Sequence, residues 1–341
     1  MVESGESRPA LDRFGTSADP VAAADALIDR LGAVRREIGT VIFGQQTVID
    51  EVLTAILSGG HALLVGAPGL GKTLLVETLG TVLGLGARRV QFTPDLMPAD
   101  ITGSEILEED ASGRRAFRFI QGPVFTQLLM ADEINRASPR TQSALLQAMQ
   151  EHKVAVAGTD QPLPSPFHVL ATQNPIEQEG TYPLPEAQLD RFLLQVDLSY
   201  PDLAAERAML LATTGTARPG VEPVLALGEL EAAQALLRAL PIGESVVDAI
   251  LTLVRGARPD TADDDSLRRS LAWGPGPRAA QALMLATRAR ALLDGRLSPS
   301  IDDVAALAHP VLRHRMALSF SARAEGVTLS ALIDGLVRRL G

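Results

Sequence analysis

Apolar residues recur at helical spacing over the first part of the chain, from Val21 to Leu57. Leu27 and Leu31 belong to this stripe, which is interrupted near Phe43-Gly44 and then resumes. A repeat of this kind is typical of amphipathic helices, so the pattern predicts two of them. The preceding residues, 1–20, mix Ser, Gly, Pro and charges without periodicity, which predicts a flexible N-terminal arm.

Short apolar runs then alternate with helical patterns. The run from His61 to Val65 meets a glycine and is followed by a helical stretch from Lys72 to Leu83. Alternation of this kind predicts an α/β fold, a mostly parallel sheet with helices on both faces. The other predicted strands are Val90–Phe92, Leu128–Ala131, Val169–Thr172 and Leu193–Val196.

Two β-hairpins are predicted as insertions into this alternation. In Ser104–Gln121, apolar residues lie on both sides of a Ser112-Gly113 turn. A second hairpin is predicted from Lys153–Val156 through a Pro-rich turn at residues 162–166 into the strand at Val169.

Strand signals fade beyond about Pro201, and helical patterns replace them. A chain of 341 residues is also longer than one usual compact domain. We therefore expect an α/β core over residues 21–200 and an all-helical domain over residues 201–341. The predicted helices of the second domain are Leu203–Ala212, Leu230–Leu240, Glu244–Val254, Pro277–Leu293, Ser300–Leu312 and Leu329–Leu340.

Composition narrows the functional classes. No apolar run is long enough to cross a membrane, and the charged N-terminus has no apolar stretch typical of a signal peptide, so we expect a cytoplasmic protein without membrane insertion. The chain has no cysteine, which excludes disulfides and thiolate metal sites. A net charge of −10 disfavours a nucleic-acid partner, because phosphate binding needs a basic surface.

The segment from Gly66 to Thr73 matches a phosphate-binding loop (P-loop) between a strand and a helix. Its glycines let backbone N–H groups point at phosphates, Lys72 can reach the β and γ oxygens, and Thr73 can hold Mg²⁺. The alternative is a plain glycine turn. The predicted ATP-binding residues of this segment are Gly66, Ala67, Pro68, Gly69, Leu70, Gly71, Lys72, Thr73 and Leu74.

Two acids, Asp132 and Glu133, end the apolar strand that starts at Leu128. Parallel sheets deliver ligand-binding residues at the carboxyl ends of their strands. After a P-loop, this pair predicts that Asp132 holds Mg²⁺ through water and that Glu133 orients and polarises the attacking water. By itself, an acidic pair after a strand could equally be a solvated loop or a helix cap.

The order and the amino-acid sequences of these segments resemble the MoxR family of AAA+ ATPases. The resemblance runs from about Phe43 to Val196 and continues more weakly through the helical domain. The resemblance implies that the two hairpins are the helix-2 insert and the pre-sensor hairpin of that clade. It also implies a helical lid and assembly into rings, typically hexamers. The segments that carry the resemblance are Gln91–Leu96, Gly122–Phe125, Ala131–Ala137, Ala171–Pro175 and Gly180–Phe192.

The resemblance adds three site residues. Asn174 ends a strand, where its amide could contact the attacking water or the γ-phosphate, and it matches the first sensor; otherwise it is a turn residue before a proline. Arg278 matches the second sensor, which could act in cis or in trans. The preceding Gly-Pro-Gly-Pro departs from the sequence usual in the family, and the alternative is a plain surface arginine. Arg191 matches an arginine finger that acts on a neighbouring subunit, the alternative being a salt bridge with Asp190 or Glu186.

The sequence also raises the question of a role for an arginine and for two histidines outside these motifs. Arg136 could contact a neighbour's nucleotide or form a helix-end salt bridge. His309 and His314 lack nearby acids at metal-ligand spacing, which disfavours a metal role.

These features predict a remodelling ATPase that acts on a client protein, and the resemblance suggests a partner with a von Willebrand factor A domain. A nucleic-acid motor and a metal-chelatase motor subunit of the same clade are the alternatives. The first would need basic hairpins, which this sequence does not offer.

Overall fold

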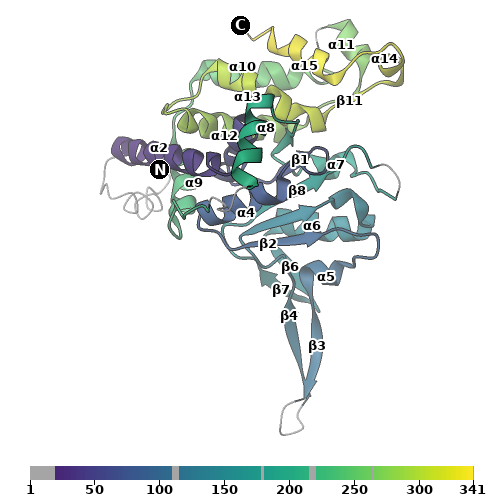
Figure 1. Ribbon diagram of the computed structural model, residues 1–341. Helices are drawn as coiled ribbons and strands as arrows, with labels where there is room; N and C mark the ends of the chain where they lie inside the picture. The colour runs from purple at the N-terminus through teal and green to yellow at the C-terminus, as the bar shows by residue number, and fades with distance from the viewer. Residues whose placement is uncertain (1–19, 110–114, 178–179, 215–219, 263, 341) are drawn as a thin grey trace, which may run out of the picture.

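The computed structural model describes residues 20–109, 115–177, 180–214, 220–262 and 264–340. A parallel sheet lies at the centre, a helical layer covers one end of the molecule, and a long hairpin projects from the other end (Figure 1). The predicted N-terminal arm lies outside the described residues except for Pro20, where the first helix begins. No helix within the described ranges is long and apolar enough to span a membrane.

The central sheet has five parallel strands in the order β2-β5-β8-β1-β9. Strand β5 is buried along its whole length, as expected for a parallel strand covered on both faces. The edge strand β2 is mostly exposed, which explains why hydrophobic patterning detected only its end. The strands are β1 (Ala62–Val65), β2 (Ala87–Gln91), β5 (Leu128–Asp132), β8 (His168–Gln173) and β9 (Leu194–Asp197).

The helices of the core follow the predicted pattern. Two long helices precede the first strand, as expected, and the helix after the P-loop begins at Lys72. The core helices are α2 (Pro20–Gly39), α3 (Gln46–Leu57), α4 (Lys72–Val82), α5 (Pro98–Thr102), α6 (Pro139–Glu151) and α7 (Glu186–Leu189), and a 3₁₀ turn, η2, covers Ile134–Arg136.

The first predicted hairpin is present. Strands β3 (Gly103–Glu109) and β4 (Arg115–Gln121) pair antiparallel and form the long projection in Figure 1. The predicted Ser112-Gly113 turn lies outside the described residues.

The second hairpin prediction was wrong in its partner strand and its turn. Strand β6 (Lys153–Val156) pairs with β7 (Thr159–Pro162), and the turn is Ala157-Gly158. Both turn residues have positive φ, 47° and 81°, as a two-residue hairpin turn requires. Because proline has no N–H to donate, the prolines end β7 and form the link to β8 instead of the turn.

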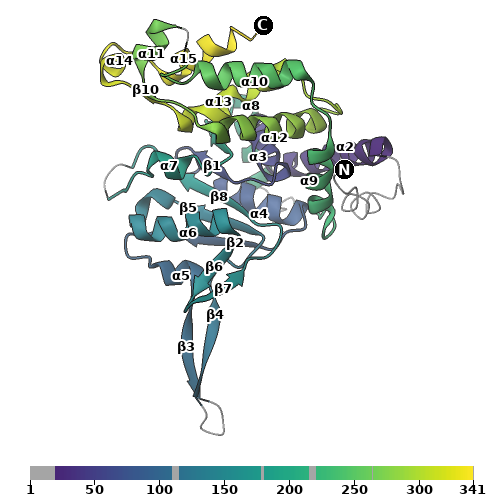
Figure 2. The same cartoon turned by 180° about the vertical axis from the view of Figure 1, so that it is seen from behind.

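The region after Pro201 is helical, as predicted, with one short antiparallel strand pair that hydrophobic patterning did not indicate. Helix α12 of this region packs against both α3 and α10 (Figure 2). Its helices are α8 (Leu203–Thr213), α9 (Glu229–Ala239), α10 (Glu244–Gly256), α11 (Asp265–Ser270), α12 (Pro277–Leu293), α13 (Ile301–Leu312), α14 (Phe320–Ala324) and α15 (Leu329–Val337), with a 3₁₀ turn η3 (Arg313–Arg315) and strands β10 (Leu271–Trp273) and β11 (Ala317–Leu318).

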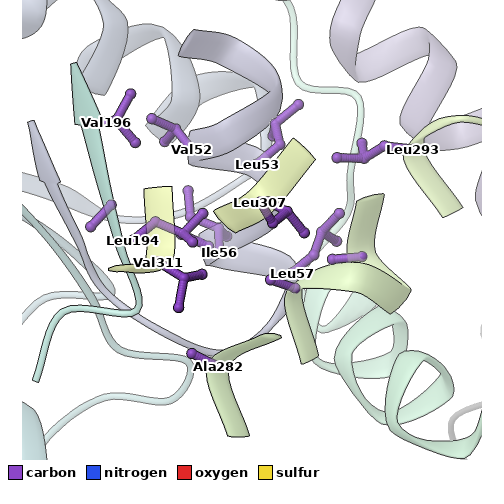
Figure 3. Packing of buried hydrophobic residues seen from close by; sticks show 14 of the residues in the cluster. Val52, Leu53, Ile56, Leu57, Leu194, Val196, Ala282, Leu293, Leu307 and Val311 are labelled. Atoms are coloured by element: carbon purple, nitrogen blue, oxygen red, sulfur yellow. The ribbon is translucent and has the colours of Figure 1, made fainter. Parts of the chain in front are cut away.

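One hydrophobic cluster joins this helical region to the core. Leu53 and Ile56 of α3, Leu194 of β9 and Leu307 of α13 are all buried in it (Figure 3). Because apolar burial is the main stabilising contribution to such contacts, this shared cluster holds the helical region against the core.

Candidate functional site

The P-loop leaves β1 at Val65 and opens α4 at Lys72. Gly69 and Gly71 have φ values of 83° and 76°, a conformation that side chains with a Cβ rarely adopt. Gly71 is the N-cap of α4 and provides no side-chain hydrogen bond to the first turn. The first N–H groups of α4 therefore remain available for an anion, which the helix dipole also favours.

A cavity of about 470 Å³, here called the P-loop cavity, brings together Asp132, Glu133, Asn174 and most of the predicted P-loop residues. Gly66, Ala67 and Leu70 are predicted site residues that do not line it. Lys72 Nζ donates to Gly66 O at 2.7 Å, across the loop. Burial lowers the pKa of Lys72, while Asp132 and Glu133 act in the opposite direction. The cavity is lined by Pro68, Gly69, Gly71, Lys72, Thr73, Leu74, Arg89, Gln91, Asp132, Glu133 and Asn174.

Asp132, at the end of β5, has both carboxylate oxygens engaged. Its Oδ1 accepts from the Thr172 hydroxyl at 2.5 Å, and its Oδ2 accepts from Arg89 Nη2 at 2.5 Å. Thr172 is fully buried on the neighbouring strand β8. Sequence reasoning missed Arg89 and Thr172, although Thr172 immediately precedes the Gln173-Asn174 strand end.

Glu133 follows in a left-handed conformation, with φ 56°, and its backbone N donates to the Thr172 hydroxyl at 2.8 Å. Its Oε2 accepts from Gln91 Nε2 at 2.7 Å. Arg136 Nη1 lies 3.4 Å from the same oxygen and 3.6 Å from Glu177 Oε2. Arg136 thus forms the salt-bridge arrangement that was one of its two predicted roles, and one of its partners is Glu133.

Asn174 forms the turn that was one of its two predicted roles, and its role as a sensor stays a prediction. Its Oδ1 accepts from the backbone N of Ile176 at 3.1 Å, which is an Asx turn. The buried side chain also lines the P-loop cavity. The turn fixes the orientation of the amide at the end of β8.

An apolar cavity of about 280 Å³ adjoins the P-loop cavity. It shares the lining residues Gly69, Gly71 and Leu74 with the P-loop cavity. Its apolar walls come from the α2–α3 connection and from the segment after β9. Sequence reasoning missed this cavity because its walls are far apart in the chain and match no motif. Its other lining residues include Val41, Ile42, Phe43, Tyr200 and Met209.

A third cavity of about 450 Å³ is lined by two further predicted residues, Arg191 and Arg278, and is here called the arginine cavity. Arg191 Nη1 donates to Leu146 O at 2.5 Å, and its buried Nε has no hydrogen-bond partner within the described residues. Arg278, at the start of α12, lies 3.7 Å from Asp190 Oδ2. Asp190 pairs with Arg278 and not with Arg191, which contradicts that predicted alternative for Arg191.

Arg315 closes the wall of the arginine cavity and has only 2% of its side chain exposed. Its Nε donates to Asp190 Oδ1 at 2.8 Å, and its Nη groups donate to the carbonyls of Asp190, Phe192, Leu193 and Val311. Arg315 therefore ties η3 to the segment that carries Arg191. Except for Val311, its partners lie more than a hundred residues away, so no local sequence signal indicates this role.

The P-loop cavity and the arginine cavity lie at opposite edges of the sheet, that is, at the two ends of its parallel strands. The P-loop cavity is lined by residues that follow β1, β5 and β8, at the carboxyl ends of these strands. The arginine cavity is lined by Gly59–His61 and Asp190–Leu193, which precede β1 and β9. These strands are parallel and four residues long, so the edges are about 13 Å apart at about 3.3 Å per residue. The arginine cavity and the P-loop cavity share no lining residue.

The residues of the P-loop cavity fit a magnesium ion bound together with phosphate. The hydroxyl of Thr73 and the carboxylate of Asp132 are hard oxygen ligands on the same cavity wall. No cluster of three or more histidine, cysteine or acidic side chains suited to a metal occurs among the described residues. His309 pairs with Asp334, and the buried His314 contacts Phe192 O, so both have other partners.

Comparison with known proteins gives consistent results. The family described as "ATPase family associated with various cellular activities (AAA)" matches residues 61–194, and "AAA lid domain" matches residues 267–336. Chaperone MoxR1 of Mycobacterium tuberculosis is 39% identical, over 94% of this chain and 85% of its own. Protein MoxR of Paracoccus denitrificans is 33% identical, over 86% and 91%. The crystal structure of a putative ATPase from Cytophaga hutchinsonii superposes with a TM-score of 0.85 at 36% identity, covering 92% of this chain and 95% of that one.

Proposed function

The chain belongs to the MoxR family of AAA+ ATPases, and from this premise we propose that it uses ATP hydrolysis to remodel, assemble or activate a client protein. A relative that covers most of the chain is named a chaperone. The observation that carries the proposal for this chain is the division of its predicted catalytic residues between two opposite edges of the sheet.

The P-loop cavity binds the phosphates in this proposal. Lys72 neutralises the β- and γ-phosphates, and the first turn of α4 donates its N–H groups. Thr73 and Asp132 would hold Mg²⁺, which would supply charge neutralisation at the phosphates. Glu133 orients the attacking water and Asn174 contacts it or the γ-phosphate, because in-line positioning matters more than basicity in phosphoryl transfer. Gln91 Nε2 donates to Oε2 of Glu133, so it helps to set the orientation of this carboxylate.

The adjoining apolar cavity receives the base. Ile42, Phe43 and Met209 offer flat, apolar contacts beside the loop that holds the phosphates. Aromatic and aliphatic walls of this kind are typical of pockets that bind an adenine ring.

The arginine cavity completes the ATP site of a neighbouring subunit. Arg191 precedes β9 at the amino edge of the sheet, away from its own P-loop. The fork of its guanidinium is suited to γ-phosphate oxygens of a second copy. Arg278 lines the same cavity, which favours action in trans for this residue as well. We therefore propose a ring, a hexamer by analogy with the family, with a von Willebrand factor A domain protein as an expected partner.

The hairpins favour a protein client over a nucleic acid. Arg115 pairs with Glu109, Arg118 with Glu108, and Lys153 with Asp160, all within their own hairpins. Cations neutralised by neighbouring carboxylates contribute little to a nucleic-acid backbone, where binding depends on releasing counterions from the phosphates. A metal-chelatase motor subunit would share this architecture and charge. The identity of the client protein decides between a chelatase motor and a remodelling ATPase.

A trapping experiment tests this proposal. Glu133→Gln should bind ATP without turnover and retain a client protein during purification with ATP, whereas Lys72→Ala, which cannot bind ATP, should not retain it. If the two variants retained the client equally, client binding would not depend on ATP, and this outcome would contradict the proposal. If single-stranded nucleic acid raised the ATP turnover of the parent several-fold while no protein was retained, the nucleic-acid motor would replace this proposal.

A further inference from the structure

Arg89 lies in the P-loop cavity, but neither the sequence motifs nor the family resemblance assigns it a role. It comes from the exposed edge strand β2, and about half of its side chain is exposed. Its Nη2 and Nε lie 2.5 Å and 3.1 Å from a single oxygen of Asp132, Oδ2. The other oxygen of Asp132 accepts from Thr172, so the carboxylate has a donor on each side.

The same guanidinium reaches the second acid through one intermediate side chain. Arg89 Nη2 donates to Gln91 Oε1 at 2.9 Å, and Gln91 Nε2 donates to Glu133 Oε2 at 2.7 Å. Arg89 and Gln91 are two residues apart on one strand, so their side chains lie on the same face. One cation therefore restrains both acidic residues of the site.

A buried carboxylate needs a compensating positive charge. The side chain of Asp132 is only 11% exposed, and the Arg89 guanidinium contacts it directly. A divalent cation held at this carboxylate would bring the same kind of charge to the same group. Two cations at one carboxylate repel each other, so binding of one weakens binding of the other.

We propose that Arg89 is a positioning residue: while the P-loop cavity holds no metal ion, its guanidinium supplies the positive charge at Asp132 that Mg²⁺ would otherwise bring. Mg²⁺ and Arg89 therefore compete for this carboxylate. The proposal rests on the proposed function because it takes Asp132 as a metal-binding residue. Arrival of the metal with ATP displaces the guanidinium toward solvent, which the exposed strand β2 leaves room for. Displacement also withdraws Arg89 from Gln91, and Glu133 then loses a restraint only when the metal and nucleotide are present.

Binding of Mn²⁺ tests this competition without measuring activity. The affinity would be measured by electron paramagnetic resonance on the full chain saturated with a non-hydrolysable ATP analogue. Arg89→Ala should tighten Mn²⁺ binding by roughly tenfold, within the range of 5- to 150-fold typical for coupled sites. Arg89→Lys, which keeps the charge, should stay within about threefold of the parent by the same scale.

Arg88 provides a matched control. It is the adjacent, exposed residue on β2, and alternation along the strand places its side chain on the opposite face. Arg88→Ala removes the same formal charge and should leave the Mn²⁺ affinity unchanged. An unchanged or weakened affinity in Arg89→Ala, or an equal tightening in Arg88→Ala, would overturn the proposal.

Asp132→Asn separates this inference from the proposed function. If Asp132 holds the metal, this variant should weaken Mn²⁺ binding. A variant with unchanged Mn²⁺ affinity would contradict the assignment of Asp132 itself and with it the competition. Weakened binding in Asp132→Asn without tightening in Arg89→Ala would contradict only the role of Arg89.

Discussion

The P-loop cavity and the arginine cavity have nearly the same volume, about 470 and 450 Å³, but opposite chemistry. The first holds a phosphate-binding loop, a lysine and two acids at the carboxyl edge of the sheet. The second holds three arginines, with Asp190 as a paired carboxylate, at the amino edge. Each has groups proposed to act in ATP hydrolysis that the other lacks, and our proposal that one complete site needs two subunits rests on this difference.

The two edges also differ in how the helical region joins the core. Beside the arginine cavity, Arg315 is buried and all its contacts lie between η3, α13 and the segment after α7. Beside the apolar cavity, the joint is a polar pocket that contains Glu51 and the ion pair of Asp197 with Arg313. The joint at the arginine cavity therefore centres on a buried arginine, whereas the other contains Glu51, a carboxyl group whose pKa is raised by burial.

The largest effect is expected on the P-loop side. Lys72→Ala removes the cation that lies across the loop, and we expect ATP binding to fall below detection. Equilibrium binding of a fluorescent ATP analogue measures this, with Lys153→Ala as a control because Lys153 pairs with Asp160 outside the cavity. Binding by Lys72→Ala within a few-fold of the parent would remove Lys72 from the site.

Arg191→Ala should show the converse behaviour. We expect ATP binding close to that of the parent and a loss of turnover of roughly 10³ to 10⁵, because fingers of this kind act on the transition state. Steady-state turnover and equilibrium binding measured on the same preparation check both parts. Arg323→Ala, at an exposed helical-region arginine outside both cavities, should turn over ATP like the parent. Loss of binding in parallel with turnover would place Arg191 in its own subunit's site.

Arg315→Met should lower the free energy of unfolding by about 3–5 kcal/mol. The substitution removes a buried guanidinium that donates to Asp190 and to four backbone carbonyls, and leaves Asp190 with only the longer contact to Arg278. Denaturant-induced unfolding measures the loss, and the exposed Arg323→Ala should change it by no more than about 0.5 kcal/mol. A change below about 1 kcal/mol for Arg315→Met would show that the joint beside the arginine cavity does not depend on this residue.

The smallest effect concerns the opposite joint and its pH dependence. Burial, with the nearby charges of Asp197 and Asp50, raises the pKa of Glu51 from 4.5 to about 7. A raised carboxyl pKa means that the folded state binds the proton more tightly, so its contribution to stability is lost as pH rises from about 4.5 to about 7. Glu51→Gln removes this titration. The Tm of the variant should therefore rise relative to the parent between pH 5 and pH 8, and parallel Tm curves would contradict the assignment.

Much of the fold and of the P-loop cavity could be predicted because the information is local. Gly66–Thr73 and Asp132-Glu133 stand at strand ends, and parallel strands bring their carboxyl ends to one edge. Arg89 was missed because an exposed edge strand has no apolar pattern, and Arg315 because its partners are distant in sequence. The second hairpin was mispredicted because prolines are strong turn signals, whereas alanine in the first position of the Ala157-Gly158 turn gives no such signal.

The most direct test of the claim that two cavities form one ATP site is to mix two inactive variants. Arg191→Ala retains an intact P-loop cavity, and Glu133→Gln retains an intact arginine cavity. If the site is shared, mixed rings contain junctions in which both halves are intact, and turnover should rise well above that of either variant alone. Labelled subunits and light scattering establish that mixed rings have formed. Confirmed mixed rings with turnover no higher than that of the separate variants would contradict the shared site.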